Sequence, residues 1–187
     1  MSTSDLIEIA EESDLSPEID QGIRDLLCLC FPPDVSIFSQ SRYWHGTAPE
    51  FSFYRREAGK ITGHVGIVRR IIRAGSSQIT IAGVQNLAVA PSRRKSGLGA
   101  LLMIRAMAEA RRRGIAFGLL FCVPGLARFY SSLGWKIQER AFFMADESGG
   151  RERIPDKNIG MTLTLGTEPF PPGAVSYTHL RAHETDS

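Results

Sequence analysis

The spacing of hydrophobic residues in the first half of the chain predicts one helix followed by a set of strands. Residues 17–29 have helical spacing, with Ser16 as a cap before Pro17, and their apolar positions are Ile19, Ile23, Leu26 and Leu27. Strand-like segments are expected at 5–10, 51–57, 62–73 and 78–89, and a loop with a short helix at 32–49. The turn composition at Gly59 and at 75–77 predicts antiparallel hairpins.

The second half alternates between helix and strand. Residues 97–113 predict a helix that Gly114 ends, with an apolar face of Ala100, Leu101, Ile104, Met107 and Ala108. A buried strand at 117–123, a short helix at 124–132, and strands at 135–140 and 161–165 follow, with a polar loop at 146–157. The fold class is therefore α/β in the broad sense, of the α+β kind, with mostly antiparallel strands.

Prolines at 169, 171 and 172 predict the end of regular structure, so one domain is expected over residues 1–172. Residues 173–187 have no apolar period and are expected to form an unstructured tail. The sequence of this tail resembles translated adaptor sequence, so we expect it to be a non-native addition and give it no part in function.

The composition argues against a nucleic-acid-binding, membrane or metal-binding protein. The chain is 43% hydrophobic and 22% charged, which is ordinary for a globular protein, and its net charge of +2 does not favour a nucleic-acid partner. No apolar run reaches the length of about 20 residues that a bilayer requires, and the first residues are not signal-like, so we expect a cytoplasmic protein without membrane contact. Cys28, Cys30 and Cys122 lack zinc spacing, and no metal is expected.

The most informative stretch is the basic turn between the strand at 78–89 and the helix at 97–113. Gly97 and Gly99 let backbone N–H groups approach an anion at a helix amino terminus, and Arg93, Arg94 and Lys95 add positive charge. The stretch matches neither the nucleotide-triphosphate loop nor the three-glycine dinucleotide fingerprint. It therefore predicts binding of a phosphate-bearing ligand of another kind.

Two motifs together resemble a known superfamily. Arg94-x-x-Gly97-x-Gly99 after Leu87-Ala88-Val89, and the later Phe-Tyr-Ser-Ser-Leu-Gly-Trp at 129–135, are similar to the two signatures of the GCN5-related N-acetyltransferase (GNAT) superfamily. The resemblance covers roughly residues 50–142. It implies a GNAT fold: a mixed, mostly antiparallel, twisted sheet splayed at its central strands, with flanking helices.

The resemblance also implies site residues. Leu87, Ala88 and Val89 would pair with the pantetheine arm as an added strand does. The pyrophosphate of acetyl-CoA, or of another acyl-CoA co-substrate, would be held by the turn and the first helical residues: Arg94, Lys95, Ser96, Gly97, Leu98, Gly99 and Ala100. Tyr130 would donate a proton to the departing thiolate, the alternative being a core aromatic beside Phe129.

The sequence identifies no general base. Many members of the superfamily have a carboxylate on the central strand, where this chain has Gln85 and Asn86. Glu50, His45 and His64 are conceivable, but a histidine within a strand is more often structural. Cys122 has no evident activating partner and is interpreted as a buried structural thiol.

The acceptor is expected to be the primary amine of a small molecule. Residues 63–72 are similar to nodulation acyltransferases, which N-acylate chitooligosaccharides, and to aminoglycoside 2′-N-acetyltransferases, so an amino sugar is one hypothesis. Tyr43, Trp44 and His45 are candidate acceptor contacts or, equally, an edge of the core. A peptide or protein amino-group acetyltransferase and a non-catalytic acyl-CoA-binding regulatory module stay open as alternatives, as does a homodimer.

Overall fold

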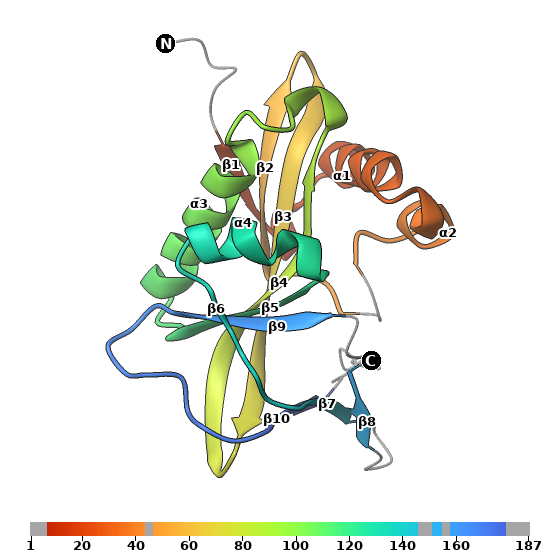
Figure 1. Cartoon of the computed structure of the whole chain (residues 1–187). Helices are drawn as coiled ribbons and strands as arrows, with labels where there is room; N and C mark the ends of the chain where they lie inside the picture. Colours follow the sequence, from red (N-terminus) through yellow and green to blue (C-terminus); the bar gives the residue numbers. More distant parts are fainter. Residues whose placement is uncertain (1–6, 44–46, 146–150, 155–157, 179–187) are drawn as a thin grey trace, which may run out of the picture. The chain divides into compact units, whose positions relative to one another are not determined.

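The computed structural model describes residues 7–43, 47–145, 151–154 and 158–178 (Figure 1). The chain divides into two compact units, each made of two segments. Unit 1 comprises Met1–Val68 and Val84–Ala106, and unit 2 comprises Arg69–Gly83 and Met107–Ser187. Three elements pass from one unit into the other: β3 (Lys60–Ala74), β4 (Ser77–Val89) and α3 (Leu98–Arg112).

Unit 1 combines an antiparallel set of strands with the amino-terminal helices. β1 (Ile7–Glu11) pairs with β2 (Phe51–Glu57), which pairs with the first part of β3. Between β1 and β2 the chain forms α1 (Pro17–Cys30) and α2 (Val35–Phe38), with single 3-10 turns at Glu12–Asp14 and Pro32–Asp34. A third turn, Pro91–Arg93, links β4 to α3.

The predicted first helix is confirmed, and its sequence explains both its start and its buried face. The Ser16 hydroxyl accepts a hydrogen bond from the Ile19 N–H at 3.3 Å, and Pro17 occupies the first turn. The four predicted apolar positions are buried in a cluster with Phe38, Tyr54 and Ile61. Each such side chain contributes about 1.5–3 kcal/mol when fully buried, so tertiary packing stabilises this helix.

Unit 2 contains β5 to β10 and parts of β3 and β4. These strands are hydrogen-bonded in the order β6-β9-β5-β4-β3-β10-β7-β8. Their bounds are β5 Phe117–Cys122, β6 Lys136–Ile137, β7 Phe142–Ala145, β8 Arg151–Arg153, β9 Ile159–Thr164 and β10 Val175–Thr178. β4 pairs with β5 in parallel, as β10 does with β7, whereas β5–β9, β6–β9, β7–β8 and β3–β10 are antiparallel. The parallel register of β4 and β5 joins only Ile81–Gly83 to Phe117–Leu119.

The two faces of β5 carry different parts of the unit 2 core. Phe117 and Leu119 pack with Ile72, Ile81 and Phe142 on one face. On the other face a side chain at Gly118 would collide with the Trp135 ring, so glycine allows that ring to approach the strand. A 3-10 turn at Pro124–Leu126 and α4 (Ala127–Ser132) follow β5.

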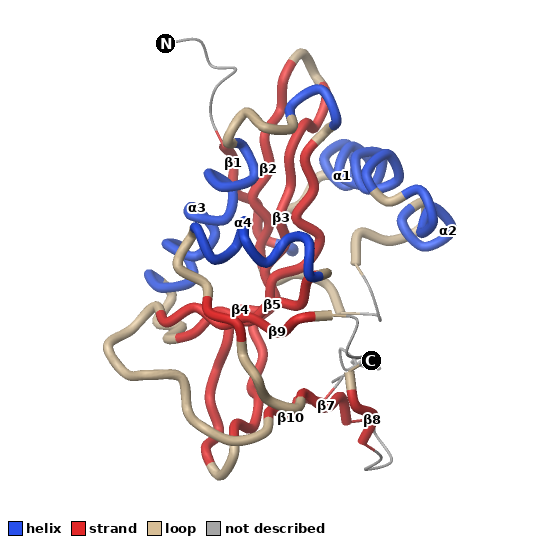
Figure 2. The backbone as a smooth tube through the Cα atoms, viewed as in Figure 1, coloured by secondary structure: helices blue, strands red, loops and turns tan. Residues whose placement is uncertain are grey.

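Mostly antiparallel strands flanked by helices confirm the predicted mixed class (Figure 2). None of the helices in the part of the chain that the structure describes is long and apolar enough to cross a membrane.

Three sequence predictions are corrected by the structure. Residues 175–178 are not part of an unstructured tail, because β10 pairs with both β3 and β7. The predicted loop at 146–157 contains β8, and the predicted strand at 135–140 is reduced to β6. Strands as short as these carry too few residues to show an alternating pattern.

The predicted apolar face of α3 is also wrong in part. Leu101 is 39% exposed and Ile104 is 55% exposed, while Met107 is buried as predicted. The buried positions are Leu98, Leu102, Met103, Ala106, Met107 and Ala110. A stripe shifted by one residue fits the same 3.6-residue period, because this helix has apolar residues on more than one face.

Candidate functional site

The backbone between β4 and α3 adopts a conformation that only a few residues tolerate. Lys95 has φ of +63° and Gly97 has φ of +84°. A side chain at Gly97 would meet nothing within 4 Å, so the requirement for glycine comes from the backbone angle and not from crowding. The turn brings the chain into α3 at Leu98, as the phosphate-loop prediction requires.

Hydrogen bonds fix this turn and leave the start of α3 open. Ser96 Oγ donates to the Arg93 carbonyl at 2.6 Å and accepts from the Leu98 N–H at 3.4 Å. The Gly97 carbonyl accepts the first helical bond, from Leu101 N–H at 3.0 Å. The N–H groups of Gly99 and Ala100 lie in the first turn, where a helix offers no internal acceptor, so they are available to an anion.

The three basic residues of the turn differ in their partners. Arg93 Nε donates to Glu57 Oε2 at 2.6 Å, so Arg93 fastens the turn to β2. Arg94 and Lys95 are exposed. Beside the turn lies a pocket of about 210 Å³ lined by Arg55, Glu57, Arg93, Ser96, Gly97, Leu98 and Leu101.

A thiol at the end of α1 forms a hydrogen bond with the end of β4. Cys30 Sγ donates to the Val89 carbonyl at 3.4 Å. Burial raises the pKa of the Cys30 thiol, while the neighbouring Arg94 guanidinium acts in the opposite direction. The contact joins two predicted site residues, Val89 and Arg94, to the same helix end.

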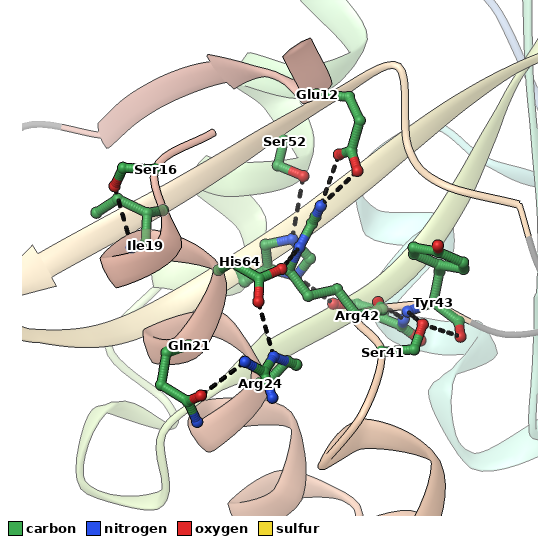
Figure 3. A network of polar contacts seen from close by, with 12 residues as sticks. Glu12, Ser16, Ile19, Gln21, Arg24, Ser41, Arg42, Tyr43, Ser52 and His64 are labelled. Atoms are coloured by element: carbon green, nitrogen blue, oxygen red, sulfur yellow. Dashed lines mark hydrogen bonds and ion pairs between the residues drawn. The ribbon is translucent and has the colours of Figure 1, made fainter. Parts of the chain in front are cut away.

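Unit 1 contains a buried polar network centred on Arg42 (Figure 3). Arg42 is only 3% exposed and forms ion pairs with Glu12 at 2.6 Å and Asp20 at 2.5 Å. Arg24 bonds the other oxygen of Asp20 at 2.8 Å. Two arginines therefore face two carboxylates, and the network carries no net charge.

His64 belongs to this network as a neutral, structural residue. It is fully buried, with Nδ1 donating to the Asn86 carbonyl at 3.1 Å and Nε2 accepting from the Ser52 hydroxyl, 3.3 Å away. Burial, together with the charge of Arg42, lowers the pKa of His64 to about 3. His64 cannot take a proton at neutral pH, which removes it from the candidate bases.

β4 is irregular at the two residues where the superfamily often has its base. Asn86 has φ of +50°, and its side-chain amide donates to the Arg42 carbonyl at 2.8 Å. Gln85 Nε2 lies 3.5 Å from the Thr47 carbonyl, at the long limit for a hydrogen bond. Both amides are neutral, so neither residue is a general base.

Tyr130 sits at the end of α4 in unit 2, and the surrounding motif is a helix cap. The Gly134 N–H donates to the Ser131 carbonyl at 3.0 Å and the Trp135 N–H to the Tyr130 carbonyl at 3.2 Å, with Gly134 at φ of +87°. These two bonds define a Schellman motif, which requires a left-handed residue at the glycine. The cap directs Trp135 toward Gly118.

The Tyr130 side chain is packed among aromatics. Its ring lies 4.9 Å from Phe129 and 6.3 Å from Trp135, and 7% of the residue is exposed. Burial, and secondarily the neighbouring Cys122, raises the pKa of Tyr130 to about 12. The hydroxyl therefore keeps its proton at neutral pH.

Cys122 is a buried thiol whose Sγ donates to Met161 Sδ at 3.8 Å. Burial raises its pKa, which disfavours the thiolate that an acyl carrier would need. The interpretation as a structural thiol fits this geometry.

The predicted phosphate and pantetheine residues, 87–89 and 94–100, are contiguous in unit 1, and Tyr130 is in unit 2. Trp44 and His45 lie outside the described residues. Sequence reasoning missed Arg42, Asp20 and Glu57, since no local pattern marks residues whose partners are distant in the chain.

Unit 2 also contains a pocket of about 380 Å³. Phe121 and Phe142, whose rings are 5.0 Å apart, form part of its wall, and Gln138, Glu139, Arg140, Arg153 and Asn158 supply polar groups. It contains none of the predicted site residues.

Comparison with known proteins gives a consistent relationship. The chain is 29% identical over 105 residues to nodulation protein A of Mesorhizobium sp. (strain 7653R), covering 50% of this chain and 54% of that protein. It thus spans about half the length of the curated relatives it matches.

Solved structures show the same fold. A GNAT family acetyltransferase from Brucella melitensis in complex with acetyl-CoA has a TM-score of 0.61 at 21% identity, covering 92% of this chain and 96% of that one. An aminoglycoside 6′-N-acetyltransferase complexed with coenzyme A has a TM-score of 0.59 at 18% identity, covering 87% and 99%. The fold is therefore the GNAT fold.

The model of the family described as nodulation protein A (NodA) matches residues 7–145. This match extends from β1 to β7 and includes both GNAT-like motifs. The chain belongs to the NodA family.

Proposed function

We propose that this protein is an acyl-CoA-dependent N-acyltransferase that transfers an acyl group, acetyl in the first instance, to the primary amine of a small molecule. The observation that carries the proposal is the turn from Arg94 to Ala100. The turn combines a left-handed glycine, N–H groups at the start of a helix and two exposed cations. In the superfamily motif that it resembles, the corresponding residues bind the pyrophosphate.

The reaction needs a neutral amine, a stabilised tetrahedral oxyanion and a proton for the leaving thiolate. The amine nitrogen attacks the thioester carbonyl carbon, an N–C bond forms, and the C–S bond breaks. Tyr130, protonated at neutral pH, is proposed to donate to the departing sulfur. Leu87, Ala88 and Val89 are proposed to bind the pantetheine arm through their backbone groups.

An amino sugar is the acceptor that we favour. Membership in the NodA family supports it, as does the structural similarity to an aminoglycoside 6′-N-acetyltransferase. The alternatives are a peptide or protein amino group, and a regulatory module that binds acyl-CoA without turnover.

The test combines acetyl-CoA with a panel of amines: aminoglycosides, glucosamine oligomers, polyamines and short peptides. Free thiol release and acetyl-CoA affinity are measured on the full chain and on Tyr130→Phe. We expect release with one acceptor class and a loss of kcat of about 100-fold in the variant, the low end of general-acid effects, with unchanged affinity.

Tyr54→Phe is the matched control, because it also removes one hydroxyl, which bonds Glu8 in unit 1 at 3.1 Å. It should keep its kcat. No binding of acetyl-CoA would overturn the proposal, whereas binding without turnover would support the regulatory module.

A further inference from the structure

Gln85 has a polar atom that the fold leaves unused. Its Oε1 is buried and has no hydrogen-bond partner among the described residues, and its Nε2 is held by a single 3.5 Å contact to Thr47. A buried acceptor without a partner costs free energy, and native proteins keep few of them. Such an atom is a candidate for contact with a ligand.

The position of Gln85 in unit 1 gives this atom a context. It precedes Asn86, where φ of +50° interrupts the regular strand, and is two residues from Leu87, where the proposed pantetheine segment begins. Asn86 is fully engaged, with its amide on Arg42 and its carbonyl on His64. The side-chain amide of the neighbouring Gln85 is held less firmly and can reorient toward a ligand.

The titratable groups of the adjoining network offer no base. Arg42 and Arg24 are paired with Glu12 and Asp20, and the pKa of Asp20 is lowered by its two arginines against the opposing effect of burial. His64 is neutral and already hydrogen-bonded at both nitrogens. Glu50, at the start of β2, has a partner of its own.

We infer that Gln85 positions the acceptor: its Oε1 accepts a hydrogen bond from the neutral amine and does not take the proton. This inference rests on the proposed function. As the N–C bond forms and the C–S bond breaks, the proton leaves the amine nitrogen for water, and the thiolate is protonated by Tyr130. The amide can turn toward the amine because, among the described residues, its hydrogen bond is a long contact.

This arrangement selects for weakly basic amines. The network gives no base among the described residues, so in this arrangement the acceptor must already be neutral at the working pH. A lysine-type amine has a pKa of about 10.4, whereas an amine beside electron-withdrawing groups, such as a peptide α-amino group, has one of about 8. The amine of a 2-amino sugar, flanked by hydroxyl and ring carbons bearing oxygen, belongs to this second class.

The experiment measures kcat/KM against pH for the full chain, Gln85→Glu and Gln85→Ala, with a glucosamine oligomer, a short peptide and an alkyl diamine. The wild-type rate should rise with pH as each ammonium group loses its proton, and it should be at least tenfold lower for the diamine at neutral pH. Gln85→Glu should move the rising limb to lower pH by about one unit, because a carboxylate can take the proton. Gln85→Ala should lower kcat about tenfold with acetyl-CoA affinity unchanged.

Gln78→Glu is the matched control, since Gln78 is exposed on the same strand. It should keep the wild-type pH profile. Identical profiles in the wild type and Gln85→Glu, with full kcat in Gln85→Ala, would overturn the role of Gln85 while leaving the transferase intact. If the Gln85 variants fail to fold, equal wild-type rates for weakly and strongly basic amines would overturn it, and no thiol release with any amine would overturn the proposed function itself.

Discussion

Two polar regions of unit 1 use arginine in opposite ways. In the buried polar network, Arg42 is 3% exposed and forms ion pairs with Glu12 and Asp20. In the turn before α3, Arg94 and Lys95 are exposed, and the first N–H groups of the helix have no internal acceptor. Most polar groups of the first region are paired within the fold, with Arg42 Nη1 unpaired among the described residues, whereas the second region exposes its charged side chains.

The two regions should respond differently to substitution. A buried charge must be paired with other residues of the fold. Removing one partner therefore lowers the free energy of unfolding. An exposed anion site at a helix start contributes little to the stability of the fold. Its loss therefore lowers the affinity for the anion and leaves the free energy of unfolding nearly unchanged. Damage to the network should therefore affect unfolding, and damage to the turn should affect acyl-CoA binding.

The largest effect is expected from Arg42→Met, which removes the buried cation shared by Glu12 and Asp20 and leaves Asp20 with Arg24 alone. The free energy of unfolding should fall by about 2–3 kcal/mol, below the range of about 3–5 for fully buried pairs. The reduction reflects the exposure of the carboxylates, 36% for Glu12 and 33% for Asp20. Urea unfolding measures it, and an equal loss in Arg24→Met, whose side chain is 19% exposed, would contradict the special role of Arg42.

His64 predicts a specific dependence of stability on pH. Its pKa is about 3 in the folded chain and about 6.5 when unfolded, so the unfolded state binds more protons between these values. The free energy of unfolding should therefore fall as the pH is lowered through this window, by at most about 1.4 kcal/mol per unit. Between pH 6.5 and 5 the loss should be about 2 kcal/mol. His64→Gln, compared with the wild type over the same pH range, should lack this component.

Gly97→Ala tests the left-handed backbone of the turn. Alanine at φ of +84° is strained by about 1 kcal/mol, which corresponds to about fivefold weaker acetyl-CoA binding if the bound turn needs this angle. Titration calorimetry gives the affinity. Gly125→Ala is the control, since a Cβ there meets nothing within 4 Å and its φ is not positive; equal weakening in both variants would argue against the turn.

The smallest effect is expected from Arg94→Gln. An exposed cation contributes about 0.5–1 kcal/mol at low salt, so acetyl-CoA affinity should fall about two- to fivefold. The difference should disappear near 1 M salt, where the screening length is about 3 Å. A loss that persists at high salt would indicate a packing role, for instance through the Cys30 contact.

Much of the fold was predictable because it depends on local signals. The cap at Ser16 and the spacing of Ile19, Ile23, Leu26 and Leu27 define α1 without reference to anything distant. The turns at Gly59 and Gly75 separate β2, β3 and β4 where the sequence places them. By contrast, the strand β10 was mistaken for a tail, since its stability comes from pairing with β3 and β7 and not from its own composition.

The candidate site divides in the same way. The order of residues alone determined the turn before α3 and the capped helix of Tyr130, because each is a short segment whose backbone conformation is fixed by its own glycines and hydrogen bonds. The neutrality of His64, the ion pairs of Arg42 and the unused oxygen of Gln85 were decided only by tertiary structure. Burial and partner choice depend on groups 12 to 44 residues apart in the chain, and no local pattern encodes such distances.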